Sequence, residues 1–256
     1  GRIGTDGLHL LEHLESLGVD THWTIVDPLE KTGHAIIQVE DAGGENAILL
    51  YSGANSSIDL DQISSTLDDF FPKSILLLQN EISHIDSLLS IGKSHSFEVV
   101  LNPAPYTRDI SQTGNLENVD LLIVNESEAA SICNDHVKTG GGLDASKTLA
   151  ALRRQVRNST QILLTLGTRG AILDAPGQSQ ISVAAFDAGP ALDTTGAGDT
   201  FIGFFLASRA AGASDEVAMH RASAAAALCV TTSGAMDSIP SKSQVDALTH
   251  CHRDDS

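Results

Sequence analysis

Four short apolar segments, each separated from the next by a stretch long enough for a helix, constrain the fold most strongly. They occupy residues 74–78, 98–101, 121–124 and 162–165. A strand that is apolar along its whole length is typical of a sheet buried on both faces. Strands joined by helix-length crossovers run parallel. The sequence therefore predicts an α/β fold, with a doubly wound, mostly parallel sheet flanked by helices.

Two segments at the N-terminal side stand outside this alternation. Residues 33–40 and 46–51 are β-rich and flank the turn sequence 41–45, which predicts a hairpin. Before them, one helical face is apolar and predicts a helix that ends at Gly18; its members are Leu10, Leu11, Leu14 and Leu17. With 256 residues, 41% of them hydrophobic, we interpret residues 1–256 as one domain.

Composition excludes several functional classes. Acidic residues outnumber basic ones 33 to 15, and the formal charge of −18 argues against nucleic acids and anionic membranes as partners. Cys133, Cys229 and Cys251 are too few and too dispersed for a disulfide framework, which fits a reducing compartment. No apolar segment is long enough to span a bilayer. We therefore expect a cytoplasmic protein, with the nucleus as a further compartment.

The segment 193–201 reads Asp-Thr-Thr-Gly-Ala-Gly-Asp-Thr-Phe and leads into an apolar run. Gly196 and Gly198 allow a tight turn into a helix, where backbone N–H groups and the helix dipole attract a phosphate. An acidic residue beside such an anion site has a use if it accepts a proton from an attacking hydroxyl. Asp199 is therefore the candidate base, and the amides of 196–198 the candidate anion hole. The alternative for Asp199 is a helix cap.

Five motifs carry a family resemblance. Besides 193–201, they are Gly-Ala-Asn at 53–55, Leu-Asn-Pro-Ala-Pro at 101–105, Val-Asn-Glu-Ser-Glu-Ala at 124–129 and Thr-Leu-Gly-Thr-Arg-Gly at 165–170. In order and spacing the chain resembles the ribokinase-type carbohydrate kinases, from Gly1 to about Pro240. The resemblance implies ATP and Mg²⁺ as cofactors, a sugar as the small-molecule substrate, and a small β lid formed by residues 33–51.

The resemblance also implies roles for individual residues. Glu81 and Asp199 match sugar contacts, and Asn125 and Glu128 match residues that hold Mg²⁺ through water. The nucleotide contacts would be Asn125, Thr165, Leu166, Gly167, Thr168, Arg169, Gly170, Gly198 and Ser223. Each has a structural alternative: a capping pair for Asn125 and Glu128, an ordinary turn for 165–170, close helix packing for Ser223, and a plain surface position for Glu81.

A monovalent-cation site follows from the same resemblance. Loop oxygens suit K⁺, which takes several oxygen ligands. The implied ligands are the Asp193 carboxylate, the Ser238 hydroxyl and backbone carbonyls; the carbonyls are those of Thr195, Cys229, Thr232 and Gly234. The alternative is a plain connection between two elements.

Together these features predict an ATP-dependent kinase that phosphorylates D-ribose at its 5-hydroxyl. The alternatives are another sugar or nucleoside kinase of the fructokinase-like kind, and a truncated, non-catalytic nucleotide-binding protein. An exposed lid predicts a homodimer. In the resembled family, a first strand, an Asn/Asp pair and a glycine-rich loop precede the position of Gly1. We therefore expect the isolated 256-residue chain to be poorly soluble or partly unfolded and to lack kinase turnover, and we expect folding and turnover to be recovered when that segment is restored.

Overall fold

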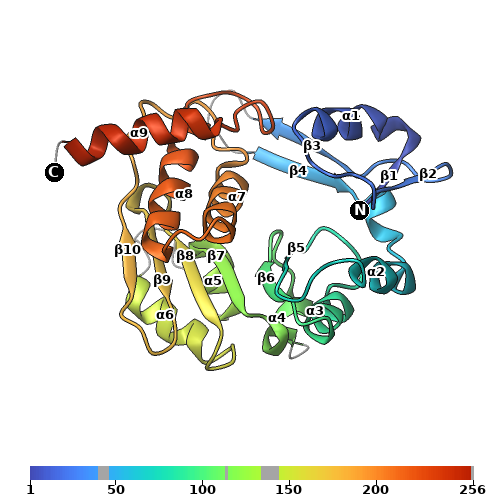
Figure 1. Cartoon of the computed structure of the whole chain (residues 1–256), viewed down its shortest axis with the longest axis horizontal. Helices are drawn as coiled ribbons and strands as arrows, with labels where there is room; N and C mark the ends of the chain where they lie inside the picture. Colours follow the sequence, from blue (N-terminus) through green and yellow to red (C-terminus); the bar gives the residue numbers. More distant parts are fainter. Residues whose placement is uncertain (40–45, 113–114, 134–143, 255–256) are drawn as a thin grey trace. The chain divides into compact units, whose positions relative to one another are not determined.

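The computed structural model describes residues 1–39, 46–112, 115–133 and 144–254. The chain forms two compact units, Gly1–Val119 and Asp120–Ser256 (Figure 1). The interpretation as one domain stays a prediction. Among the helices within the described ranges, none is long and apolar enough to cross a membrane.

In its described residues, the first unit contains three pairs of strands. Strands β1 (Arg2–Gly4) and β2 (Ile25–Asp27) are parallel, β3 (His34–Val39) and β4 (Asn46–Tyr51) are antiparallel, and β5 (Ile75–Gln79) and β6 (Glu98–Asn102) are parallel. The helices of this unit are α1 (Leu8–Ser16), α2 (Leu60–Leu67), α3 (Ile85–Ser94) and α4 (Arg108–Gln112). The predicted pairing of segments 33–40 and 46–51 is confirmed; its turn, 41–45, lies outside the described residues.

Helix α1 forms where the leucine spacing predicted it, and Gly18 follows with a φ of 81°. Its apolar face is less covered than expected, because none of its residues is buried and Leu17 is 67% exposed. The neighbouring strands β1 and β2 are instead joined by an ion pair. The guanidinium group of Arg2 on β1 donates to the Asp27 carboxylate on β2, at 2.6 and 3.0 Å, and to the carbonyl of Ser57 at 2.8 Å.

The second unit has a sheet in the order β10-β9-β8-β7. Strands β7 (Leu121–Asn125) and β8 (Gln161–Thr165) are parallel, as their apolar sequences predicted. Strands β9 (Ala171–Asp174) and β10 (Ile181–Val183) extend the sheet antiparallel. The sequence did not reveal these two, because they are short and because short connections, instead of helix-length crossovers, join β8 to β9 and β9 to β10.

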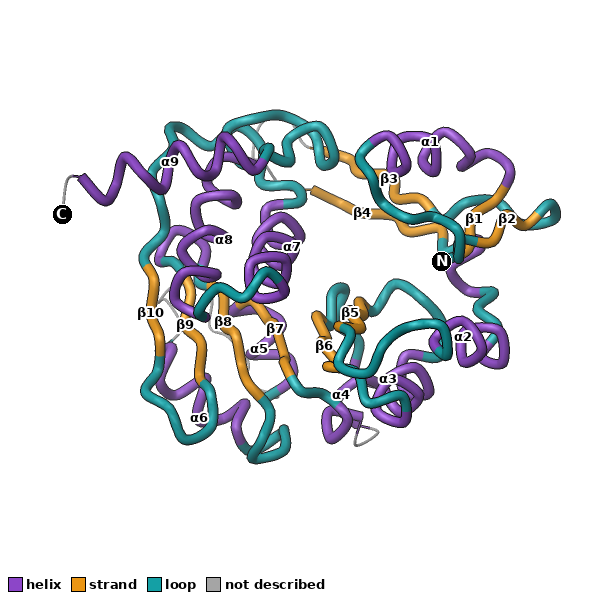
Figure 2. Tube along the Cα trace, viewed as in Figure 1, coloured by secondary structure: helices purple, strands orange, loops and turns teal. Residues whose placement is uncertain are grey.

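Two helix pairs cover the strands of the second unit (Figure 2). Helices α5 (Glu126–Ile132) and α6 (Ala145–Arg153) pack on β7 and β8; α7 (Ala197–Ala210) and α8 (Asp215–Cys229) pack on each other, with α9 (Lys242–Asp254) along α8. The middle residues of β7 and β8 are almost completely buried; they are Leu122, Ile123, Ile162, Leu163 and Leu164. Buried alanines on α8 present little bulk, so a neighbouring helix can approach closely.

We predict that Gly170 is needed for the fold of the second unit. Its φ is 91°, and a Cβ placed there would lie 1.9 Å from the carbonyl oxygen of Val183 at the end of β10. Gly170→Ala should lower the free energy of unfolding by about 3 kcal/mol or more, because a left-handed backbone and a backbone clash add. Urea denaturation measures this loss.

Gly177→Ala is the matched control. Gly177 has a φ of 73°, but a Cβ there would meet no atom within 4 Å. We expect this variant to lose only about 1–2 kcal/mol, from the left-handed conformation alone. Equal losses for both variants would contradict the role of the contact between Gly170 and Val183.

Candidate functional site

The glycine-rich segment forms a turn at the start of α7, as predicted. Gly196 is the residue before the helix and has a φ of 75°. A Cβ there would lie 3.2 Å from the carbonyl oxygen of Ala235, so both backbone shape and space favour glycine. The first helical bond runs from the Thr200 amide to the Gly196 carbonyl at 2.8 Å. The amides at the first turn of a helix lack helical partners, which makes this end of α7 suitable for an anion.

Asp199 lies in the first turn of α7 and is exposed. Thr200, the next residue, is buried with only 3% of its surface exposed. The helix therefore turns one polar side chain of this pair outward and the other into the core. This places a carboxylate at the same helix end as the candidate anion hole.

A cavity of about 290 Å³ adjoins this helix end. It brings together seven residues that the sequence identified: Thr165, Gly167, Thr168, Gly170, Ala197, Gly198 and Ser223. Its other walls are mainly apolar and were not predicted from the sequence: Ala185, Phe186, Ala191, Thr194, Phe201, Ala226, Ala227 and Val230. A largely apolar hollow with a few polar groups is the usual form of a small-molecule site.

Ser223 is buried, and its hydroxyl donates to the carbonyl of Ala184 at 3.0 Å. This bond ties α8 to the segment that follows β10. Phe186, on the same segment, packs edge-on against His220 with ring centroids 6.1 Å apart. The wall of the cavity is thus fixed by contacts between α8 and this segment. The spacing of Ser223, Ala226 and Ala227 on one helix face is the signal that would have indicated it.

The segment 165–170 is a tight turn between β8 and β9. The Leu166 amide donates to the Gly170 carbonyl at 2.8 Å, and the Gly170 amide donates to the Gly167 carbonyl at 3.0 Å. The guanidinium group of Arg169 forms an ion pair with the carboxylate of Glu126 at the start of α5. The turn is therefore anchored to α5 as well as to the sheet.

Asn125 and Glu128 form a capping box at the start of α5. The Glu128 amide donates to Asn125 Oδ1, and the Asn125 amide donates to Glu128 Oε2, both at 2.9 Å. The structural alternative is thus present, while the role at Mg²⁺ stays a prediction. Asn125 pairs with Thr165 in the register of β7 and β8. Both motifs therefore begin at the same edge of the sheet.

The Asp193 carboxylate joins the two segments that carry the predicted cation ligands. Oδ2 accepts the Gly234 amide at 3.0 Å, and Oδ1 accepts the Thr195 amide at 2.9 Å. The Gly234 amide foremost, and then Thr195, hold the pKa of Asp193 below its usual range. Ser238, which follows Gly234 in the same segment, is buried. The Cys229 carbonyl accepts the Thr232 amide at 3.1 Å. Carboxylate, hydroxyl and carbonyl oxygens are the donors that suit a hard cation.

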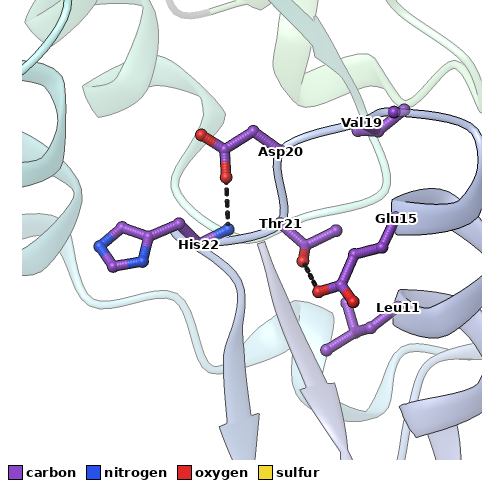
Figure 3. A pocket seen from close by; sticks show the side chains of 7 residues that line it. Leu11, Glu15, Val19, Asp20, Thr21 and His22 are labelled. Carbon is purple, nitrogen blue, oxygen red and sulfur yellow. Dashed lines mark hydrogen bonds between the residues drawn. The ribbon is translucent and has the colours of Figure 1, made fainter.

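The first unit contains the predicted residue Glu81 and a hollow beside α1. Glu81 is exposed in the turn that follows β5, and its role stays a prediction. A wide hollow of about 530 Å³ lies between the end of α1 and β2 (Figure 3). In it the Thr21 hydroxyl donates to Glu15 at 2.5 Å, and the His22 amide donates to Asp20 at 2.9 Å. Both bonds close the local turn, so we centre the functional site on the second unit.

Comparisons with known proteins agree on one family. A profile described as pfkB family carbohydrate kinase matches residues 1–242. The chain is 32% identical over 238 residues to a deoxyribokinase from Salmonella typhi, covering 91% of this chain and 74% of that protein. It is 33% identical over 253 residues to a ribokinase from Haemophilus influenzae, covering 97% and 80%.

Solved structures show the same fold. The structure of ribokinase from Giardia lamblia has a TM-score of 0.84 at 27% identity, and the match covers 98% of this chain and 82% of that one. The structure of Arabidopsis thaliana ribokinase complexed with ribose and ATP has a TM-score of 0.77 at 29% identity, covering 97% and 80%. The predicted α/β fold is confirmed.

We predict that the Asp193 carboxylate stabilises the second unit in a pH-dependent way. A carboxylate whose folded pKa is lowered adds stability above its unfolded pKa of about 3.9, and the gain is lost as the pH falls through the folded pKa. The Tm difference between wild type and Asp193→Asn should therefore be large at pH 6 and shrink below about pH 4. Thermal denaturation across this range measures it.

Asp187→Asn is the control for the loss of a turn contact. Asp187 accepts the Gly189 amide within its own turn, at 3.0 Å. We expect the Tm of this variant at pH 6 to stay close to that of the wild type. A pH-independent effect of Asp193→Asn would contradict the prediction.

Proposed function

The chain belongs to the pfkB family of carbohydrate kinases, and from this premise we propose that it transfers the γ-phosphoryl group of ATP to the 5-hydroxyl of D-ribose. The observation that carries the proposal is the start of α7. There Asp199 shares one helix end with the Gly196 turn and the cavity. A proton acceptor and an anion site at one place are what phosphoryl transfer to an alcohol requires.

In this proposal each group has one task. The Asp199 carboxylate accepts the proton of the sugar hydroxyl as its oxygen attacks phosphorus. The amides of Gly196, Ala197 and Gly198 stabilise the negative charge on the transferring group, helped by the dipole of α7. Because the Gly196 turn and the first turn of α7 fix these amides, they need no rearrangement during the reaction.

The nucleotide would occupy the cavity of the second unit. The cavity, with its volume of about 290 Å³ and its apolar walls, fits part of a nucleotide, such as the base. The glycine-rich turn 165–170 offers backbone groups at the rim of the cavity. Leu166 and Arg169 belong to this turn, which supports their assignment as nucleotide contacts together with the rest of the segment. The structures of related kinases with ADP, and with ribose and ATP, support the same kind of ligand.

Two cations complete the proposed site. Mg²⁺ would be held through water by Asn125 and Glu128, and would neutralise phosphate charge. K⁺ would be held by the oxygens grouped around Asp193, which come from Asp193, Thr195, Cys229, Thr232, Gly234 and Ser238. The hydrogen bonds of Asp193 to Thr195 and Gly234 support this grouping, because they fix both segments beside the anion hole.

For the sugar, the relatives favour a pentose. A deoxyribokinase is as similar to this chain as the ribokinases are, so deoxyribose is a second candidate substrate. Glu81 is the proposed sugar contact of the first unit. We also propose a cytoplasmic enzyme that pairs through β3 and β4, whose exposed apolar residues Ile36, Leu49, Leu50 and Tyr51 support such a contact.

The central test of this function is Asp199→Asn in the full-length protein. The amide keeps the shape of the side chain but cannot accept the proton. We expect kcat with ribose to fall by about 10²- to 10⁴-fold, while the Kd for ATP stays within about tenfold. Glu216→Gln, the same chemical change in the first turn of α8, is the control and should leave kcat unchanged. Near-wild-type turnover of Asp199→Asn would overturn the assignment.

A second prediction separates nucleotide binding from stability. Gly198 lines the cavity, and a Cβ there would meet no atom of the protein within 4 Å. Gly198→Ala should therefore stabilise α7 by about 0.5–1 kcal/mol, since alanine favours a helix, yet weaken nucleotide binding about tenfold or more by intruding on the ligand. Calorimetric titration with ADP and thermal denaturation measure the two effects.

Gly203→Ala is its matched control. Gly203 lies on the same helix and is exposed, and a Cβ there also meets no atom within 4 Å. This variant should gain similar stability and keep the wild-type affinity for ADP. If both variants bind ADP like the wild type, the nucleotide does not approach Gly198.

A further inference from the structure

The thiol of Cys229 lies where three segments of the second unit meet. Cys229 is the last residue of α8 and is completely buried. Its Sγ is 3.4 Å from the hydroxyl oxygen of Thr200, 3.2 Å from that of Ser238 and 3.8 Å from the carbonyl oxygen of Thr195. One sulfur atom thus contacts the turn before α7, the first turn of α7 and the segment after α8.

The donors and acceptors around this sulfur can be assigned. The Thr200 hydroxyl donates to Sγ, and the Ser238 hydroxyl donates to the carbonyl of Ala235 at 3.0 Å. The single proton of the thiol is then left for the Thr195 carbonyl or the Ser238 oxygen. The sulfur thus accepts a hydrogen bond from Thr200 and donates one to the Thr195 carbonyl or the Ser238 oxygen. The buried hydroxyls of Thr200 and Ser238 therefore have hydrogen-bond partners.

The contacts of the sulfur flank the proposed anion hole. Thr195 directly precedes Gly196, and Thr200 directly follows Asp199. The orientation of the Thr195–Gly196 peptide decides where the next amides point. A group that holds the Thr195 carbonyl on one side and Thr200 on the other therefore limits how this turn can move.

We infer that Cys229 is a positioning residue for phosphoryl transfer: its thiol holds the turn 194–196 against the first turn of α7, and so fixes the amides of the anion hole relative to Asp199. The inference rests on the proposed function of 196–199 and gives the thiol of Cys229 a role separate from that of its backbone carbonyl, which is a proposed K⁺ ligand. Its side chain acts through Thr195 and Thr200. A displacement of about 1 Å at such a site is enough to lower turnover strongly.

The test compares Cys229→Ala with Cys229→Ser in the full-length protein. Alanine removes both hydrogen-bonding functions, whereas serine keeps a donor and an acceptor at the same place. We expect Cys229→Ala to lower kcat about 10- to 100-fold with the KM for ribose within about twofold, because positioning and not sugar binding is lost. Cys229→Ser should keep kcat within about fivefold of wild type.

Thr200→Val tests the same contact from the other side. Valine keeps the volume of threonine, so the helix should fold normally without the hydroxyl that donates to Sγ. This variant should also lower kcat, and the double variant with Cys229→Ala should lose less than the product of the single losses. Independent, multiplicative losses would overturn the inference, because they would show that the two side chains do not act together.

Val245→Ala controls for loss of stability alone. Val245 is buried in a cluster with Ala224 and Ala225 of α8, and this cluster does not include Thr195, Thr200 or Ser238. We expect a lower Tm with an unchanged kcat. If Cys229→Ala behaves in the same way, or if serine is no better than alanine, Cys229 is a core residue only and the inference fails. An inactive Asp199→Asn beside a fully active Cys229→Ala would reject this inference and leave the proposed function standing.

Discussion

The hydrogen bonds of the Asp193 carboxylate are the constraint on which the site depends. They connect the Thr195 amide, within a local turn, to the Gly234 amide, which is far along the chain. The direction in which α7 begins is set by this turn and by the left-handed Gly196. A carboxylate is well suited to this task, because each of its two oxygens can accept a hydrogen bond from a backbone amide. The ionised group has no hydrogen of its own that needs an acceptor. The end of α7 that carries the proposed anion hole is therefore anchored by charge-assisted bonds instead of by packing alone.

The parallel pairing of β7 and β8 supplies the second half of the site. Its register sets Asn125 opposite Thr165, so the capping box of α5 and the turn 165–170 start from neighbouring strand ends. The ion pair of Arg169 with Glu126 adds a link between the same two elements. In an α/β sheet, ligand groups gather beyond the carboxyl ends of the strands. Here the register of β7 and β8, whose middle residues are apolar and buried, brings the two strand ends together.

The sequence predicted those elements for which residue chemistry and hydrophobic periodicity indicate the same structure. It missed those for which one of the two gives no indication. The apolar runs of β7 and β8 have one stable environment, so their position and direction could be predicted. Strands β9 and β10 are three or four residues long, too short for a period to appear. The walls formed by Phe186 and Ala226 were missed for a different reason. Apolar side chains look alike in any core, and only the fold shows which of them border a cavity.

The electrostatics of the site also follow from the chain as a whole. A protein with a net charge of −18 repels a nucleotide at long range, so local groups must supply the attraction. The basic side chain of the turn 165–170, Arg169, is already paired with Glu126. In the proposed site, backbone amides at the start of α7 and the proposed cations would supply this attraction. Oriented amides have a fixed direction and act only over a short range. Binding in such a site depends on the position of the peptide groups, which is why a buried thiol that touches the Thr195 carbonyl can matter for catalysis.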